Sequence, residues 1–412
     1  MRALAIDTGD TTWMLIATGL VFLMTPALGF FESGLIRLKN SLSVIMQTMT
    51  GMALLCTLWF IVGYTLVFGP DVSGLIGDLS NFFYINVPFS DSVSLAPTIP
   101  GITFATYQMM FAVITPLLIT GAFAERVRWS GFIMFIILWS LIVYYPLAHW
   151  IWGGGWLAQL GVYDFAGGIV IHVSAGMASL ACALVLGRRK GYGPEIMVPH
   201  NLPLAAIGAT LLWLGWFGFN AGSALASGQL AASAFLATQI GAATCALVWV
   251  LISWVRTGKP TVSAVINGAI SGLAGITPAA GFITGQSAFF LGIVLGLASY
   301  YGIVLIKERL KIDDALDVSS VHGITGMTGA LWIGLFATSA VNAAGPDGLF
   351  YGNPMQLPIQ ALGIAVGAVL ALVGTVVILK IIQYTVGLRV SEEEEDLGLD
   401  ISYHQEVAYE NK

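Results

Sequence analysis

Two histidines stand in helix-length stretches that are otherwise apolar or small, "DFAGGIVIHVSAGM" around His172 and "DDALDVSSVHGITGM" around His322. Asp164 and Asp314 precede their histidines by the same interval, and glycine and methionine follow each histidine at the fourth and fifth positions. A neutral imidazole has one donor and one acceptor nitrogen, so two imidazoles in contact share a proton. The repeated spacing predicts such a pair, able to hydrogen-bond a small neutral solute.

A single buried histidine is more often a satisfied core residue than a working one. Inside a bilayer an ionisable side chain is costly, and by default it marks a pathway or relay. On helical spacing His172 shares its face with Gly168 and Gly176, which leaves either an open groove or room for a partner helix. Two imidazoles without a thiolate or a carboxylate are too few ligands for a metal, so we expect neither metal nor cofactor.

The elements that carry these residues are predicted to be transmembrane helices. Of the 412 residues, 57% are hydrophobic and only 9% are charged, which excludes an ordinary water-soluble domain. A bilayer core about 30 Å thick requires about 20 apolar residues per helix. We predict an all-α polytopic membrane protein with eleven segments, at 12–36, 42–68, 101–125, 130–152, 165–187, 203–221, 229–255, 262–279, 285–306, 316–339 and 357–386.

The basic residues predict the orientation of these segments. All but one of the 16 Lys and Arg lie at the odd-numbered connections or at and after the end of the last segment. Short basic loops stay in the cytoplasm, so we expect the N-terminus outside and the C-terminus inside. An odd helix count permits two inverted five-helix repeats plus one extra helix. We therefore divide the chain into a transmembrane domain, 1–386, with halves at about 12–187 and 203–339 and the extra helix at 357–386, and a cytoplasmic tail, 387–412.

Further aromatic residues cluster near the predicted outer boundary. The tryptophans of "HWIWGGGWL", Trp152 among them, fit an interfacial aromatic belt or a cation–π platform for an ammonium-like ligand. Phe111 and Phe219 fit plain packing or a hydrophobic constriction. Ser223 follows Phe219 by one helical turn, where its hydroxyl could accept from a cation. Asp164 is a helix cap, and it could also stabilise that cation.

Taken together, these residues resemble the ammonium transporter family that includes the Mep and Rh proteins, in its prokaryotic Amt form. The resemblance spans nearly the whole chain. The motifs that carry it follow one another in the family's order: "FFESGLIRLKN", "GAFAERVR", "HWIWGGGWL", "DFAGGIVIHVSAG", "LLWLGWFGFNAGSA", "GLAGITPAAGF", "DDALDVSSVHGITG" and "GLRVSEEEEDLGLD".

The resemblance implies a homotrimer in the cell membrane, with one narrow pore through each protomer. Tyr107 stands where some relatives carry phenylalanine, a change that keeps an aromatic wall and alters its polarity. By position the resemblance assigns Phe111, Trp152, Ser223, Asp164 and Tyr107 to an outer ammonium site, Phe111 and Phe219 to a gate, and His172 and His322 to the pore.

The resemblance also implies a mechanism and partners. Ammonium, or methylammonium as its analogue, is held outside, loses its proton near the phenylalanines because a dry pore disfavours charge, and crosses as ammonia along the imidazoles. A cytoplasmic PII signal protein is the implied partner; nothing points to nucleic acid. The acidic run "SEEEEDLGLD" is expected to be solvated, on the face where regulation would occur. The alternatives are an ammonium sensor of the same fold, an Rh-like gas or methylamine channel, and a membrane enzyme, for which no third catalytic group is visible.

Overall fold

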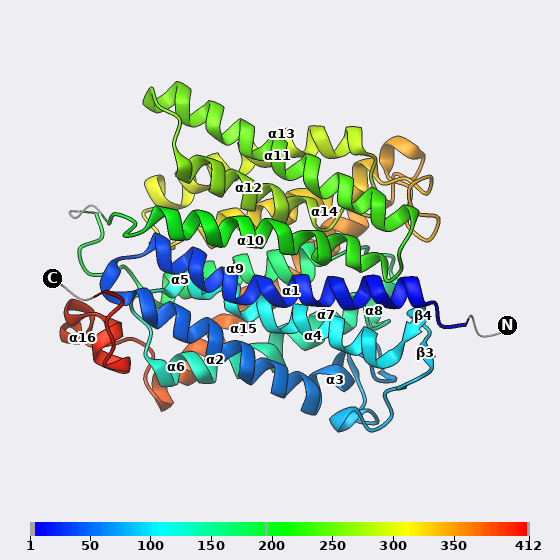
Figure 1. Ribbon diagram of the computed structural model, residues 1–412, viewed down its shortest axis with the longest axis horizontal. Helices are drawn as coiled ribbons and strands as arrows, with labels where there is room; N and C mark the ends of the chain where they lie inside the picture. Colours follow the sequence, from blue (N-terminus) through cyan, green and yellow to red (C-terminus); the bar gives the residue numbers. More distant parts are fainter. Residues whose placement is uncertain (1–4, 194–196, 410–412) are drawn as a thin grey trace.

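The computed structural model describes residues 5–193 and 197–409; the predicted tail's Lys412 and the first four residues lie outside them. The chain forms a bundle of helices that run along its long axis, with α11 and α13 at one edge and α2 and α6 at the other (Figure 1). Helix α1 begins at one end of the bundle, beside β3 and β4, and α16 lies at the opposite end. We call these ends the hairpin face and the tail face.

Within the described ranges, nine helical spans are long and apolar enough to cross a membrane. The other two predicted segments are helical but shorter: α12 (Val262–Ile276), and η8 (Ser319–Ile324) continuing into α14 (Thr325–Phe336). Every predicted segment therefore contains a helix. The nine spans are Thr8–Leu35, Leu38–Phe68, Gly101–Phe123, Trp129–Gln159, Gly168–Leu186, Leu202–Ala224, Gln229–Thr257, Gly285–Arg309 and Gln356–Thr385.

Several spans are built from consecutive α, 3-10 and π segments. Their elements are α1 (Thr8–Leu35), η1 (Leu38–Asn40), α2 (Ser41–Leu58), η2 (Trp59–Gly63), α3 (Tyr64–Phe68), α4 (Gly101–Leu118), α5 (Thr120–Phe123), α6 (Trp129–Trp139), η4 (Ser140–Tyr144), α7 (Tyr145–Ile151), α8 (Trp156–Gln159), η5 (Gly168–Val173), α9 (Ser174–Leu186), α10 (Leu202–Ala221), η6 (Gly222–Ala224), α11 (Gln229–Thr257), α13 (Gly285–Ile303), η7 (Val304–Arg309) and α15 (Gln356–Thr385). Outside the spans lie η3 (Phe82–Tyr84), η9 (Leu349–Tyr351), α16 (Glu392–Leu397) and η10 (Asp400–His404).

Polar side chains mark where several helices begin. The carboxylate of Asp7 accepts from an amide of the first turn of α1, and the side chain of Asn201 does the same for α10. Thr261 and Thr284 cap α12 and α13. Such caps satisfy amides that have no partner within the helix, so the apolar runs begin where the sequence supplies a short polar side chain.

The hairpin face carries two small antiparallel ribbons. Strand β1 (Asp71–Val72) pairs with β2 (Ile76–Gly77), and β3 (Ser92–Val93) pairs with β4 (Ala96–Pro100). The backbone oxygen of Gly74, in the first ribbon, accepts from the amide of Trp156 at the start of α8. The first ribbon is therefore tied to the segment between α7 and α8.

The tail face corrects the expectation that the acidic run is solvated. Glu395 in α16 is only 2% exposed, and its carboxylate accepts from Arg389 and from the amide of Lys190. Asp400 is also buried, and it caps α2 by accepting from the amides of Leu42 and Ser43. Buried carboxylates require such partners. Part of the run is therefore an anchor that docks the tail onto the bundle.

Candidate functional site

The two histidines come from two π-helical turns. His172 lies in η5 and His322 in η8, each of which continues into an α-helix. The amide of His172 donates to the oxygen of Gly167, 3.0 Å away, five residues back along the chain. A π turn shifts the register of side chains, so faces assigned on the ordinary helical spacing do not hold through it.

Glycines allow close packing around the two histidine segments. A Cβ added at Gly176 would lie 2.2 Å from the Cα of Gly323, and one added at Gly168 would lie 2.3 Å from the Cβ of Pro278. Of the two alternatives that the small residues left open, the structure therefore shows room for a packed neighbour and not an open groove.

The histidine rings meet edge to edge through their Nδ1 atoms, which are 3.2 Å apart. One Nδ1 must donate and the other accept, so the two neutral rings hold complementary tautomers, with one Nε2 protonated and the other free. His172 is stacked on Trp216 and Phe219, with centroid separations of 5.5 and 6.0 Å. Its Nε2 is buried and has no partner within the described part of the chain. The predicted pair is therefore formed, and one of its nitrogens is available to a solute.

Asp164 acts as the cap of the first histidine segment. Its two carboxylate oxygens accept from the amides of Gly167, Gly168, Ile169 and Val170 at 2.6 to 3.0 Å. Asp314 makes a similar contact at the second segment, where its Oδ2 accepts from the amide of Ser319. The structure thus places the Asp164 carboxylate on the backbone of the helix start.

Two phenylalanines separate an aromatic cavity from the histidines. The rings of Phe111 in α4 and Phe219 in α10 have centroids 4.5 Å apart, and both side chains are 1% exposed. Beyond them, His172 and His322 line a pocket of about 20 Å³ together with Phe219. Such a volume is about the size needed to hold one water-sized molecule.

The aromatic cavity, about 240 Å³, opens on the other side of the phenylalanine pair. Trp152, Ser223 and Phe111 are among the residues that line it. The indole of Trp152 donates to the backbone oxygen of Asp164, 2.8 Å away, which fixes the ring plane. The Ser223 hydroxyl donates to the oxygen of Phe219, so its own lone pairs remain able to accept.

Tyr107 lies behind the lining of this cavity. Its side chain is 0% exposed, and its hydroxyl lies 2.9 Å from the backbone oxygens of Gly218 and Phe219 and 3.3 Å from the oxygen of Ser223. Its ring contacts Phe111 edge to face, with centroids 4.9 Å apart. Tyr107 therefore supports Phe111 and Ser223 from the protein side.

The sequence reasoning missed part of this site. Trp216 stacks on His172 and is held by a 2.8 Å hydrogen bond to Thr277; it precedes Phe219 by about one helical turn, which was the available signal. Phe104 and Gln108 also line the aromatic cavity, and they precede Phe111 on α4 by seven and three residues, so helical spacing was an available signal. No such spacing pointed to the remaining lining residues, Phe68, Leu95, Ile151, Phe165 and Leu225.

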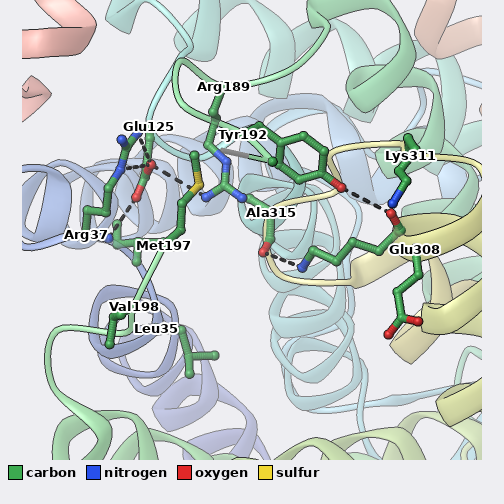
Figure 2. A pocket seen from close by; sticks show the side chains of 13 residues that line it. Leu35, Arg37, Glu125, Arg189, Tyr192, Met197, Val198, Glu308, Lys311 and Ala315 are labelled. Carbon is green, nitrogen blue, oxygen red and sulfur yellow. Dashed lines mark hydrogen bonds and ion pairs between the residues drawn. The ribbon is translucent and has the colours of Figure 1, made fainter. Parts of the chain in front are cut away.

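A second cavity that the sequence did not indicate lies on the tail face and has a volume of about 350 Å³ (Figure 2). Arg37 and Arg189 both reach Glu125 in this view, with nitrogen-to-oxygen distances of 2.6 and 3.5 Å. Arg189 also pairs with the buried Asp313 at 2.8 Å. Burial acts to raise the pKa of Asp313, but hydrogen bonds and charge from Arg189, with the charge of Arg126, lower it overall. These charges join four connections of the bundle.

Among the described residues, no group of three His, Cys, Asp or Glu side chains is placed to hold a metal ion. The fold and the site define a multi-pass membrane protein whose interior holds two imidazoles in a small pocket lined mostly by aromatic and aliphatic side chains. Ionisable side chains buried at bilayer depth are costly, and by default they mark a pathway or a relay.

The comparisons with known proteins give the family. The model of the Ammonium Transporter Family matches residues 12–409. Ammonium transporter 1 of Dictyostelium discoideum is 56% identical, with 99% of this chain and 88% of that protein covered, and the Ammonium transporter of Bacillus subtilis is 45% identical, with 98% and 99% covered. The crystal structure of Candida albicans Mep2 superimposes with a TM-score of 0.89 at 36% identity, over 94% of this chain and 88% of that one.

This chain belongs to the ammonium transporter family, as the resemblance predicted, and so to a family of transporters and not of enzymes. The relatives come from both a eukaryote and a bacterium. The similarity therefore assigns the family, and it does not single out the prokaryotic branch.

Proposed function

We propose that this protein takes up ammonium and conducts it across the membrane as ammonia. The observation that carries the proposal is the contact between His172 and His322, 3.2 Å apart, directly behind the Phe111–Phe219 pair. The proposal is supported by the names of the relatives, which are ammonium transporters.

Recruitment is assigned to the aromatic cavity. The rings of Trp152 and Phe111 offer π faces to a cation, and the Ser223 oxygen accepts a hydrogen bond from it. Asp164 acts indirectly, because its backbone oxygen holds the Trp152 indole. Tyr107 contributes by supporting this wall.

Deprotonation is assigned to the phenylalanine pair. Passing between these buried rings strips water from the ion, and a dry passage disfavours the charged form. Ammonium therefore breaks one N–H bond and gives that proton to water on the aromatic-cavity side of the rings, and ammonia moves on. Ammonia then accepts from, or donates to, the Nε2 atoms of the histidine pair. The number of charges that cross the membrane per ammonia molecule transported measures whether the proton crosses as well. Potassium has no proton to give up and is excluded.

The orientation and assembly remain proposals of the same kind. The basic residues gather on the tail face, which favours a cytoplasmic tail and an external hairpin face. The matched Asp and His segments, η5 and η8, support two inverted halves with one extra helix, α15. We also propose a homotrimer, and a PII-type signal protein that binds the cytoplasmic face.

The test is transport by proteoliposomes after an ammonium jump, measured both as current and as methylammonium uptake. His172→Ala and His322→Ala should each lower the uptake rate at least tenfold, since each loses its half of the shared hydrogen bond. Ser179→Ala is the matched control, because Ser179 lies on α9 next to η5 and its buried hydroxyl has no partner among the described residues. Binding of ammonium without uptake by the wild type would favour a sensor instead.

A further inference from the structure

His149, which the transport route does not use, makes two short contacts at the hairpin face. It lies in α7 with 0% exposure; its Nδ1 is 2.8 Å from the backbone oxygen of Val67, and its Nε2 is 2.8 Å from Oδ1 of Asp71. Both neighbours are hydrogen-bond acceptors. A neutral imidazole has only one N–H, so it would turn one lone pair toward an acceptor oxygen at contact distance.

The carboxyl partner is an ion at neutral pH. The hydrogen bond from His149 is the largest cause that lowers the pKa of Asp71, and the amide of Gly74 lowers it further. Because Asp71 cannot donate when ionised, both ring nitrogens of His149 must donate. The two acceptor contacts therefore fit a buried imidazolium, paired with a carboxylate whose side chain is 35% exposed.

This ion pair holds the chain segment that carries Trp152. Helix α7 ends at Ile151, and the amides of Gly153 and Gly155 both donate to the backbone oxygen of His149 at 3.0 Å. A Cβ at Gly153 would lie 2.0 Å from the Val67 oxygen and 2.6 Å from Nδ1 of His149. Only glycine permits this close approach, so the turn after Trp152 is folded directly against the His149 contact.

Two neutral contacts complete the attachment. The indole of Trp150 donates to the oxygen of Leu75 at 2.8 Å, and the amide of Trp156 donates to the oxygen of Gly74 at 3.1 Å. The β1–β2 ribbon is therefore hydrogen-bonded to the segment on both sides of Trp152. Of these contacts between the ribbon and this segment, the His149–Asp71 contact pairs two ionisable groups, and the other two are neutral hydrogen bonds.

We propose that His149 is a positioning residue of the transport pathway, held as an imidazolium by Val67 and Asp71 so that Trp152 stays fixed in the wall of the aromatic cavity. The inference rests on the proposed function, because it assigns Trp152 a part in recruiting ammonium. His149 itself does not line the cavity. Its removal should therefore weaken capture of the solute more than passage through the pore.

The transport test compares His149→Gln with Asp71→Asn in oriented proteoliposomes. Glutamine cannot donate to both acceptors, so the KM for methylammonium should rise about tenfold, equivalent to the loss of one charged hydrogen bond. Its maximal rate should stay within about twofold of wild type. In Asp71→Asn the amide donates to Nε2 of a neutral ring and preserves the geometry, so KM should change less than about threefold. An unchanged KM in His149→Gln would overturn the positioning role.

A spectroscopic test examines the charge itself. Nitrogen NMR of the protein labelled with ¹⁵N-histidine, in lipid nanodiscs at neutral pH, should show the His149 ring with both nitrogens protonated. The His149 signal is identified as the one that is absent from the spectrum of His149→Gln. In Asp71→Asn, the His149 ring should show only one protonated nitrogen. One protonated nitrogen in the wild type would overturn the inference. Wild-type vesicles without uptake would instead contradict the proposed function, and the NMR result decides the imidazolium in either case.

Discussion

At the scale of single residues, the polar groups of the site are held by contacts that leave few of their atoms free. The Asp164 carboxylate uses both oxygens on four backbone amides. The His172 and His322 rings use one nitrogen each on one another. What remains for a solute is the Nε2 side of the imidazoles and the oxygen of Ser223. The chemistry that the proposed pore offers to a solute thus depends on which polar atoms already have hydrogen-bond partners in the protein.

A prediction at this scale concerns the cap. Asp164→Asn keeps one acceptor oxygen and replaces the other by a donor that faces amide N–H groups. The free energy of unfolding should fall by about 1 to 3 kcal/mol, as for buried donors left without an acceptor. The measurement is thermal melting in detergent, with Asp347→Asn as control, because Asp347 accepts from Ser339 on the exposed surface. Equal losses in the two variants would contradict the assignment.

At the scale of elements, two π turns and a glycine crossing create the histidine contact. Segments η5 and η8 place their histidines two and three residues before the following α-helices begin, at Ser174 and Thr325. The helices then cross where Gly176 meets Gly323, at a distance that no side chain could occupy. Close approach through small residues is the usual means of helix packing in membranes, where there is no hydrophobic force between helices.

Gly176→Ala tests this crossing. Because the new Cβ would lie 2.2 Å from the Gly323 backbone, the helices must separate, at a cost of about 1 to 3 kcal/mol. Methylammonium uptake should fall with the stability, since separation parts the histidines. Gly19→Ala on α1 is the control, as nothing lies within 4 Å of a Cβ there. The melting temperature and the uptake rate of the Gly19 variant should match those of the wild type. A similar loss of stability and uptake in both variants would show that the crossing is not responsible.

At the scale of the whole molecule, buried charges connect several helix ends and the C-terminal tail on the tail face. On the tail face, Arg37, Glu125, Arg189 and Asp313 come from four different connections and form one network. Glu395 adds the tail to this face through Arg389 and Lys190. Breaking one partner of a buried pair leaves an uncompensated charge, which is far more costly than losing an exposed pair.

The network predicts a pH dependence of stability. The pKa of Asp313 is lowered in the folded protein, so its contribution is present above the unfolded value of about 3.9 and is lost as the pH falls through the lower folded value. The wild-type melting temperature should therefore fall more steeply than that of Asp313→Asn below about pH 4. Parallel melting curves over this range would show that Asp313 carries no such linkage.

The amino-acid sequence by itself determined the membrane class, the position of the helical segments and the histidine pair. Hydrophobic runs must span a bilayer of fixed thickness, and the repeated Asp, His, Gly and Met spacing identifies matching places in two helices. These signals are local or periodic, so they can be read along the chain. The aromatic residues Phe111, Phe219 and Trp152, and the hydroxyl of Ser223, were located through the family resemblance, since their types alone fit plain packing equally well.

Only the tertiary structure decided which atoms meet. The Nδ1–Nδ1 contact, the stacking of Trp216 on His172 and the anchoring of Glu395 join residues far apart in the sequence. The same is true of the His149–Asp71 pair. Each of these contacts depends on how separate segments pack, and packing is set by the shapes of all neighbours at once. The spacing of residues along a single segment therefore does not indicate which residues of other segments it will contact.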